Sequence, residues 1–190
     1  MPSGPPLYVV EEIQPDRAVL IETAMARDAS LVRPRFARGV RCFAAMVGAS
    51  IAGYGWLSTQ PEWIGELQLD IRPGLGEGYV WNCATVLVHR RQGIFRAVLS
   101  GISSHARNSG LRRLWIGSVA IPAERAVGPS GFRPALRFST WRLGPAHVLR
   151  SAPSPGADSK LIADACLVLG SHDAPMRLGT SIRGRIEKVH

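Results

Sequence analysis

Alternating and near-continuous apolar runs predict several strands in the first half of the chain. Leu7–Ile13 is expected to form an opening strand. Val40–Val47 and Ser50–Thr59 are rich in β-branched and aromatic residues and flank a glycine turn, which is typical of a hairpin. Tyr79–Val88 is almost entirely apolar. We therefore expect it to be a strand buried on both faces, as in the middle of a sheet.

Helical patterns separate these runs. Pro15–Val32 is rich in helix formers, and Pro15 suits the first turn of a helix. From Ile94 to Ala106 the apolar residues recur at helical spacing along a single stripe. Asn108–Gly110 then provides a stop signal. Two helices are therefore predicted.

The second half of the chain adds further strands. We expect a short strand at Glu66–Ile71, a core strand at Leu111–Ile121 and a last strand after a turn near Gly131. The resulting order is strand, helix, hairpin, strand, helix, strand, strand. This order predicts an α+β fold with helices on the faces of a mixed sheet.

The composition of Arg150–Lys160, rich in serine, proline and glycine, predicts a linker. We therefore divide the chain into a domain over residues 1–149 and a linker with a C-terminal tail over residues 150–190. The tail carries one apolar run. It would dock on the domain, dock on a partner or stay mobile.

Composition narrows the class of protein. The chain has 190 residues, of which 46% are hydrophobic, enough for a core. It has neither a membrane-length apolar run nor the charge-then-apolar order of a signal peptide, so we expect a soluble, cytoplasmic protein with no membrane partner. Three widely spaced cysteines and five scattered histidines predict neither a disulfide framework nor a metal site.

The net charge is +9, from 23 basic and 14 acidic residues. Such a balance can indicate nucleic-acid binding. The basic residues are nearly all arginine and are dispersed, so overall composition also accounts for the charge. Nucleic acid is therefore not the favoured partner, whereas a compact anionic ligand would need only a local basic site.

One local basic site lies between the predicted strand ending at Val88 and the helix starting at Ile94. A helix start presents unpaired N–H groups, which attract phosphate. Gly93 has no side chain to keep a ligand from the backbone. Arg90, Arg91 and Arg96 add charge suited to phosphate oxygens. These residues predict a diphosphate site, although an ordinary basic turn would have the same pattern.

The stretch "VHRRQGIFRAVL" resembles the acetyl-CoA loop, R/Q-x-x-G-x-G/A, of the GNAT family of N-acetyltransferases, with Arg90, Gly93 and Phe95 at the motif positions. "GASIAGYGWLS" resembles the family's second and third strands, and "ARNSGLRRLWIGSV" its following helix and fifth strand. "GFRPALRF" is similar to the turn into its closing strand. The likeness covers about Leu7–Leu143. It implies a mostly antiparallel sheet of six to seven strands flanked by helices.

The resemblance also implies acetyl-CoA as co-substrate. The backbone of Val86, Leu87 and Val88 would bind the pantetheine arm, and the N–H groups from Arg91 to Arg96 would hold the pyrophosphate. Phe95 departs from the small residue usual at its position, but only its backbone is needed. The expected coenzyme site is Val86, Leu87, Val88, Arg90, Arg91, Gln92, Gly93, Ile94, Phe95 and Arg96.

The catalytic groups are less evident. Many family members have a tyrosine that acts as the general acid, five residues before the phenylalanine of the "GF" turn. Val127 occupies that position here. A glutamate that some members carry on the strand before the loop is replaced by Asn82, which could orient a water. Glu77, just before that strand, is a candidate base. Cys83 is a candidate acyl carrier, but no histidine lies close in sequence to activate it.

The sequence thus predicts an acetyl-CoA-dependent N-acetyltransferase. It would transfer the acetyl group directly, in a ternary complex, to a primary amine of a small molecule, peptide or protein. Glu77 and Asn82 are its candidate catalytic residues. The alternative is a catalytically silent acyl-CoA sensor or partner-binding domain with the same fold. A homodimer is compatible with either interpretation.

Overall fold

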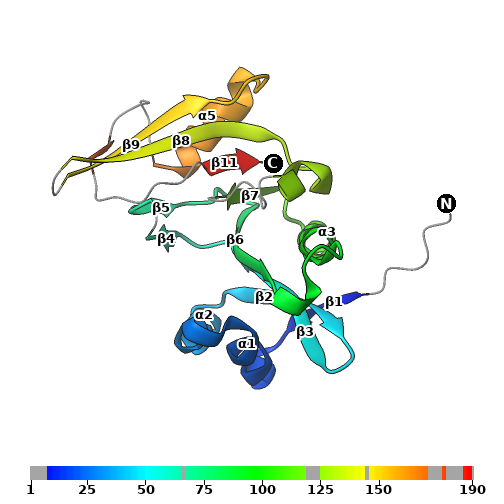
Figure 1. Cartoon of the computed structure of the whole chain (residues 1–190). Helices are drawn as coiled ribbons and strands as arrows, with labels where there is room; N and C mark the ends of the chain where they lie inside the picture. Colours follow the sequence, from blue (N-terminus) through cyan, green and yellow to red (C-terminus); the bar gives the residue numbers. More distant parts are fainter. Residues whose placement is uncertain are drawn as a thin grey trace. The chain divides into compact units, whose positions relative to one another are not determined.

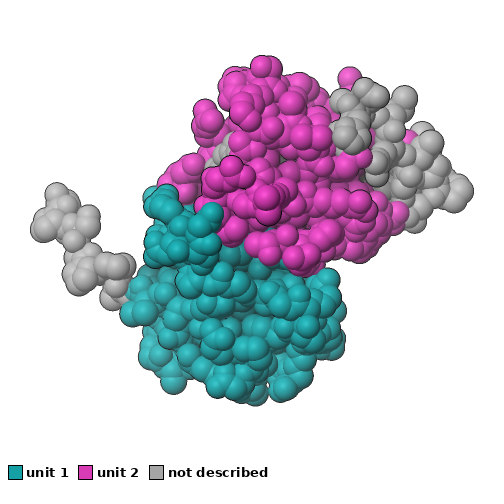
Figure 2. Space-filling view, turned by 180° about the vertical axis from the view of Figure 1, so that it is seen from behind, with its two compact units in different colours: residues 1–58, 80–110 teal, residues 59–79, 111–190 magenta. Residues whose placement is uncertain are grey.

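The computed structural model describes residues 8–65, 67–118, 125–143, 146–170, 177–178 and 186–189. The chain forms two compact units, residues 1–58 with 80–110 and residues 59–79 with 111–190, which Figure 2 shows in separate colours. Each unit is described by itself below. The domain boundary predicted after residue 149 lies inside a strand, Ala146–Pro153.

The first unit contains four strands that pair in the order β1-β2-β3-β6. The first residues of β6 belong to the second unit. The elements are β1 (Val9–Ile13), η1 (Pro15–Arg17), α1 (Ala18–Met25), η2 (Ala26–Leu31), α2 (Val32–Ala37), β2 (Arg41–Val47), β3 (Ser50–Ser58), β6 (Glu77–Thr85), η3 (Leu87–His89) and α3 (Ile94–Asn108).

The predicted hairpin is confirmed, because β2 and β3 pair antiparallel. Helices α1 and α2 lie on one face of these strands and α3 lies on the other (Figure 1). The two small residues Gly53 and Gly55 allow α3 to approach. A Cβ on Gly53 would lie 2.6 Å from Ile94 Cγ2, and a Cβ on Gly55 would lie 2.9 Å from Ile102 Cδ1. The start of α3 is therefore held closely against β3.

The first predicted helix, Pro15–Val32, is interrupted in the structure. Helix α1 ends at Met25, a buried residue, and Ala26 adopts φ +50°, which breaks the helix. A second helix, α2, follows and lies almost entirely beyond the predicted range. Pro34 is tolerated there because it lies in the first turn, whose N–H groups need no partner within the helix.

The strand predicted at Tyr79–Val88 is also corrected. Strand β6 ends at Thr85, and the next residues form the 3₁₀ turn η3. The side chains of Leu87 and Val88 are 71% and 76% exposed, so this end is not buried on both faces. Asn82 is exposed and has φ +46°, which gives the strand an irregularity near its middle.

The second unit contains the strand order β7-β11-β8-β9-β10 and the separate hairpin β4-β5. Of the strand predicted at Glu66–Ile71 only the end is a strand, and Glu66 lies outside the described residues, as does the end of Leu111–Ile121. The elements are β4 (Glu62–Ile64), β5 (Leu69–Ile71), β7 (Arg113–Ser118), η4 (Gly128–Ser130), β8 (Pro134–Leu143), β9 (Ala146–Pro153), α5 (Ser159–Val168), β10 (Arg177–Leu178) and β11 (Ile186–Val189).

The predicted linker is largely regular structure. Its first residues, Arg150–Pro153, complete β9, which pairs antiparallel with β8, and Ser159 begins helix α5. Asp158 caps that helix by accepting from the N–H of Leu161 at 2.8 Å. The tail also supplies β11, which pairs antiparallel with both β7 and β8.

The predicted class is confirmed: the protein is α+β, with mostly antiparallel strands and flanking helices. The described residues form more strands than the six or seven expected, because the tail adds β10 and β11 and the segment before β6 adds the hairpin β4-β5. None of the helices in the described ranges combines the length and apolar character that crossing a membrane requires.

Candidate functional site

The loop before α3 has the geometry of an open helix start. Gly93 is the N-cap of α3, with φ +80° and ψ 2°. The first bond of the helix runs from the Ala97 N–H to the Gly93 carbonyl at 3.0 Å. The N–H groups of Ile94, Phe95 and Arg96 therefore have no acceptor within the helix. A Cβ built on Gly93 would meet no heavy atom within 4 Å. The backbone donors thus border open space.

Positive charge surrounds this helix start. Arg90, Arg91 and Arg96 are all exposed. Arg91 shares the left-handed backbone of Gly93, with φ +63°. Within the described ranges none of the three arginines is engaged in an ion pair. Because the helix dipole adds further positive potential, the loop is an attractive position for a doubly charged anion.

Gln92 braces the loop from both sides. Its Oε1 accepts from the Tyr8 hydroxyl at 2.9 Å, and its Nε2 donates to the Val88 carbonyl at 3.4 Å. The Val86 N–H donates to the Ala52 carbonyl at 2.9 Å, which anchors the segment to β3. The loop is therefore fixed to residues far away in the sequence.

The segment Val86–Val88 is not the extended strand expected for pairing with a pantetheine arm. The Val86 carbonyl accepts from the His89 N–H at 2.9 Å and the Leu87 carbonyl accepts from the Arg90 N–H at 3.3 Å. The carbonyls of this turn are thus occupied. The N–H groups of Leu87 and Val88, which open the turn, are the backbone groups it can offer to a ligand.

Asn82 lies on β6 in the same unit as the loop. Its Oδ1 accepts from Arg35 Nη1 at 3.1 Å. The Arg35 guanidinium carbon lies 5.0 Å from the Trp56 ring centroid and 5.7 Å from that of Trp81. Sequence reasoning did not identify Arg35, because its partner Asn82 lies 47 residues away and no local pattern joins the two.

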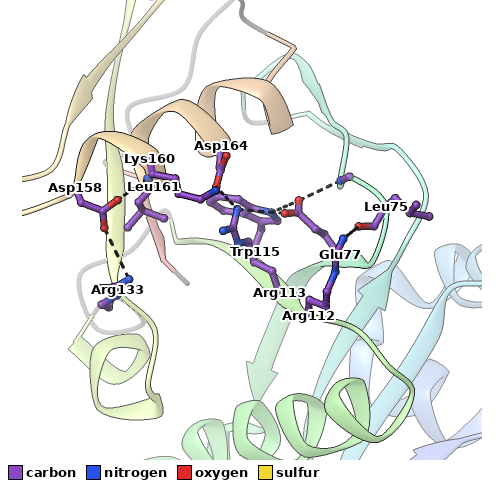
Figure 3. Close-up of polar contacts among 11 residues, drawn as sticks. Leu75, Glu77, Arg112, Arg113, Trp115, Arg133, Asp158, Lys160, Leu161 and Asp164 are labelled. Carbon is purple, nitrogen blue, oxygen red and sulfur yellow. Dashed lines mark hydrogen bonds and ion pairs between the residues drawn. The ribbon is translucent and has the colours of Figure 1, made fainter.

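Glu77 lies in the second unit, at the centre of a polar network (Figure 3). Its Oε2 accepts from Trp115 Nε1 at 2.7 Å and from the Gly74 N–H at 3.1 Å. Its Oε1 pairs with Arg113 at 3.2 Å. The Glu77 side chain is 18% exposed, and Trp115 is fully buried. These contacts favour a structural role for Glu77.

Asp164 extends this network. Arg113 Nη1 donates to it at 2.6 Å, and Lys160 Nζ donates at 3.1 Å. The hydrogen bond from Arg113 and then that from Lys160 lower the pKa of Asp164, so it is ionised at neutral pH. The network joins the start of β6 to β7 and α5.

Other groups that could act in acyl transfer are buried, as Cys42 and Val127 are, or half-buried, as Cys83 is. Burial raises the pKa of the Cys83 thiol to about 12 and also raises the pKa of Cys42. Both are therefore neutral thiols at physiological pH rather than nucleophilic thiolates. Val127, at the position of the family's tyrosine, is 1% exposed. Over the described residues no three side chains of the metal-binding types converge on one point.

Comparison with known proteins gives a match at the level of structure alone. No family model and no curated protein matches this sequence. The ribosomal-protein-S18-alanine N-acetyltransferase of Escherichia coli matches with a TM-score of 0.58 and 12% identity, covering 96% of this chain and 91% of that one. A Bacillus subtilis acetyltransferase in complex with CoA matches with a TM-score of 0.57 and 14% identity, covering 96% of each chain.

A GNAT-family acetyltransferase from Brucella melitensis in complex with acetyl-CoA matches over 66% of this chain and 82% of that one, with a TM-score of 0.51 and 13% identity. Identities this low establish the fold alone. The predicted resemblance is confirmed at that level: this chain has the GNAT N-acetyltransferase fold.

Proposed function

We propose that this protein is an acetyl-CoA-dependent N-acetyltransferase acting on a primary amine of a small molecule, peptide or protein. The observation that carries the proposal is the open helix start at Gly93. It combines backbone N–H groups that have no acceptor within the helix with three exposed arginines. Gly93 itself has a left-handed backbone, and the space where its Cβ would lie is open. This is the physical requirement for holding a diphosphate.

The residues present fit coenzyme A. In this proposal the N–H groups from Arg91 to Arg96 hold the diphosphate, and Arg90, Arg91 and Arg96 neutralise it. The N–H groups of Leu87 and Val88 are the donors available to the pantetheine amides. Bound acetyl-CoA would supply a thioester carbon open to attack by an amine. The exposed apolar side chains of Leu87 and Val88 would cover part of that arm.

The state of the Cys83 thiol supports direct transfer. A covalent acetyl-cysteine would need a thiolate, whereas burial keeps Cys83 protonated. The amine therefore attacks the thioester carbon itself, so that a C–N bond forms and the C–S bond breaks. The amine loses one proton to water or a base, and the leaving thiolate gains one. Asn82 is the polar side chain on β6 proposed to orient the reacting groups.

The silent acyl-CoA-binding domain is the second candidate. The buried apolar side chain of Val127, at the position of the family's tyrosine acid, favours it. So does the engagement of Glu77 by three donors. Both candidates require coenzyme binding, and only the first requires turnover.

Calorimetric titration of acetyl-CoA and free CoA into the wild-type protein tests the shared requirement. Release of free CoA thiol in the presence of a panel of primary amines then tests turnover. Binding with amine-dependent thiol release supports the enzyme. Binding without release from any amine favours the silent domain, and absence of binding contradicts both.

The two hydrogen bonds of Gln92 lead to a separate prediction. Gln92→Ala removes the bridge between the Tyr8 hydroxyl and the Val88 carbonyl, so the loop loses order before the coenzyme binds. We expect its dissociation constant for CoA to rise about fivefold, in line with about 1 kcal/mol for a lost hydrogen bond. Tyr8→Phe removes only one of the two bonds and should give a smaller rise. Unchanged affinity in both variants would show that the brace does not order the loop.

A further inference from the structure

Tyr54 on β3 has a buried ring and a hydroxyl without a partner. The residue is 7% exposed and belongs to the buried cluster that α1 and α2 cover. In the part of the chain that the structure describes, its hydroxyl forms no hydrogen bond. The hydroxyl still reaches solvent, because the described polar side-chain atoms that are both sealed and unpartnered are Trp56 Nε1 and Ser154 Oγ. A buried tyrosine normally directs its O–H to an acceptor, so this one is available to a ligand.

A second unpartnered donor lies on the same face of β3. Trp56, two residues after Tyr54, is fully buried and belongs to the same cluster. Its Nε1 has no hydrogen-bond partner within the described ranges. A polar group left unpaired in the interior costs stability, and each such group needs an explanation. Two of them on one strand face indicate a place where a ligand supplies the acceptor.

Strand β3 places Tyr54 beside the segment proposed to bind the coenzyme arm. The Ala52 carbonyl accepts from the Val86 N–H at 2.9 Å, so β3 meets that segment at Ala52. Tyr54 follows on the same face of β3, about 7 Å further along. Ala84 on β6 packs against the same buried cluster. Tyr54 and the first residue of the coenzyme segment therefore lie close together in the same unit.

Tyr54 and the diphosphate loop lie on opposite faces of these strands. The cluster around Tyr54 contains residues of α1 and α2, whereas α3 packs on the other face over Gly53 and Gly55 (Figure 1). Strand β6 ends at Thr85, which leaves its end free for the arm to pass from one face to the other. The thioester, at the end of the arm farthest from the diphosphate, would then emerge on the face of Tyr54, and the amine would approach from that face.

The geometry points to a proton donor: we propose that Tyr54 protonates the coenzyme sulfur when acetyl transfer breaks the C–S bond. This inference rests on the proposed function. As the amine nitrogen forms the C–N bond, the electron pair of the C–S bond goes to sulfur, and the O–H proton of Tyr54 follows it to give the CoA thiol. The phenolate then recovers, through water, the proton that the amine has lost. Val127, at the position of the family's tyrosine, has no such proton to give.

The surroundings of Tyr54 keep it protonated. Burial and next the negative charge of Asp28 on η2 raise the pKa of Tyr54 above its ordinary value. The Arg35 cation on α2 opposes this rise, and the thiols of Cys42 and Cys83, the other titratable groups that act on the phenol, are neutral. Because a general acid has to be protonated, we expect the rate to fall as the pH rises through the pKa of Tyr54, above about 10.

The chain has three tyrosines, so fluorine NMR of the protein labelled with 3-fluorotyrosine tests the contact without an acceptor. Tyrosine-to-phenylalanine variants assign the three resonances. Titration with 3′-phospho-ADP, which has the diphosphate but lacks the pantetheine arm, should shift the resonance of Tyr8, because Tyr8 bonds to Gln92 of the loop. The resonance of Tyr54 should stay in place with this ligand and should shift with CoA and acetyl-CoA.

Tyr54→Phe tests the proton transfer itself. It removes the hydroxyl and keeps the ring, so the urea midpoint of unfolding and the CoA affinity should be those of the wild type. With an amine that the wild type acetylates, kcat should fall about 100-fold while KM stays nearly constant. Placing 3-fluorotyrosine, a more acidic phenol, at position 54 should move the alkaline limb of the kcat profile to lower pH, which a structural role would not do.

A Tyr54 resonance that saturating CoA leaves in place, while that of Tyr8 responds, overturns the proton donor and leaves the coenzyme proposal intact. A wild-type kcat in Tyr54→Phe has the same meaning. If calorimetry shows no CoA binding, the proposed function and this inference fall together. If CoA binds but no amine is acetylated, the pKa of the bound CoA thiol, read from thiolate absorbance, decides. A hydrogen bond from Tyr54 would lower it relative to Tyr54→Phe, and equal values overturn the role.

Discussion

Gly93→Asp is expected to weaken coenzyme A binding by about 100-fold or more, equivalent to about 2.7 kcal/mol. Two effects combine. Gly93 has φ +80°, which an L-residue adopts only at a cost. The new carboxylate would also stand at the start of α3, where the proposed diphosphate binds, and would repel it. Calorimetric titration of acetyl-CoA into both proteins measures the difference.

Gly110 offers a matched control on the same helix. It also has φ +80°, and a Cβ at this position would meet no heavy atom within 4 Å, but it lies after the other end of α3. Gly110→Asp therefore introduces similar strain without touching the loop, and it should bind coenzyme A normally. Gly93→Asn, which tolerates the left-handed region, separates charge from strain. Normal binding by Gly93→Asp would remove the diphosphate role of the loop.

Sequence patterns predicted the elements in which apolar residues recur at a regular spacing over many residues. The stripe of α3 is buried as expected at Ile94, Val98, Leu99, Ile102 and Ala106, whereas Phe95 is only half-buried. The hairpin of β2 and β3 was equally readable, because its turn and its β-branched and aromatic residues agree. Local and tertiary preferences coincide in these elements.

Single-residue backbone changes were not predictable from such patterns. The left-handed Ala26 divides the first helix, and the left-handed Asn82 makes β6 irregular. Alanine is compatible with a regular helix, and Asn82 is a single polar residue inside an apolar run, so the repeating pattern revealed neither deviation. An apolar run likewise did not reveal that Leu87 and Val88 would be exposed.

The polar groups of the candidate site are of two kinds, those in a local sequence motif and those paired with residues far away in the sequence. The loop from Arg90 to Arg96 was identified because its motif is local in sequence. The pairing of Arg35 with Asn82 joins residues 47 positions apart, and the pairing of Trp115 with Glu77 joins residues 38 apart. No local pattern records such contacts. The partner of Glu77 therefore had to be seen in the structure.

That partner makes Glu77→Ala a decisive variant. Removing the Glu77 carboxylate would break the 2.7 Å hydrogen bond from the buried Trp115 Nε1 and would deprive Arg113 of one of its two carboxylates. We expect the free energy of unfolding to fall by about 3 kcal/mol, as for the loss of one partner from a buried polar network. Urea denaturation followed by tryptophan fluorescence would measure it.

Glu77→Gln distinguishes this structural role from that of a catalytic base. The amide oxygen can still accept from Trp115, so most of the stability should be retained, while an amide cannot take up a proton. If Glu77 is structural, the folded Glu77→Gln protein keeps its kcat and the wild-type pH profile. If Glu77 is the base, kcat falls by about 100-fold and the acidic limb of the profile disappears, although CoA still binds. The three donors on its carboxylate lead us to expect the first result.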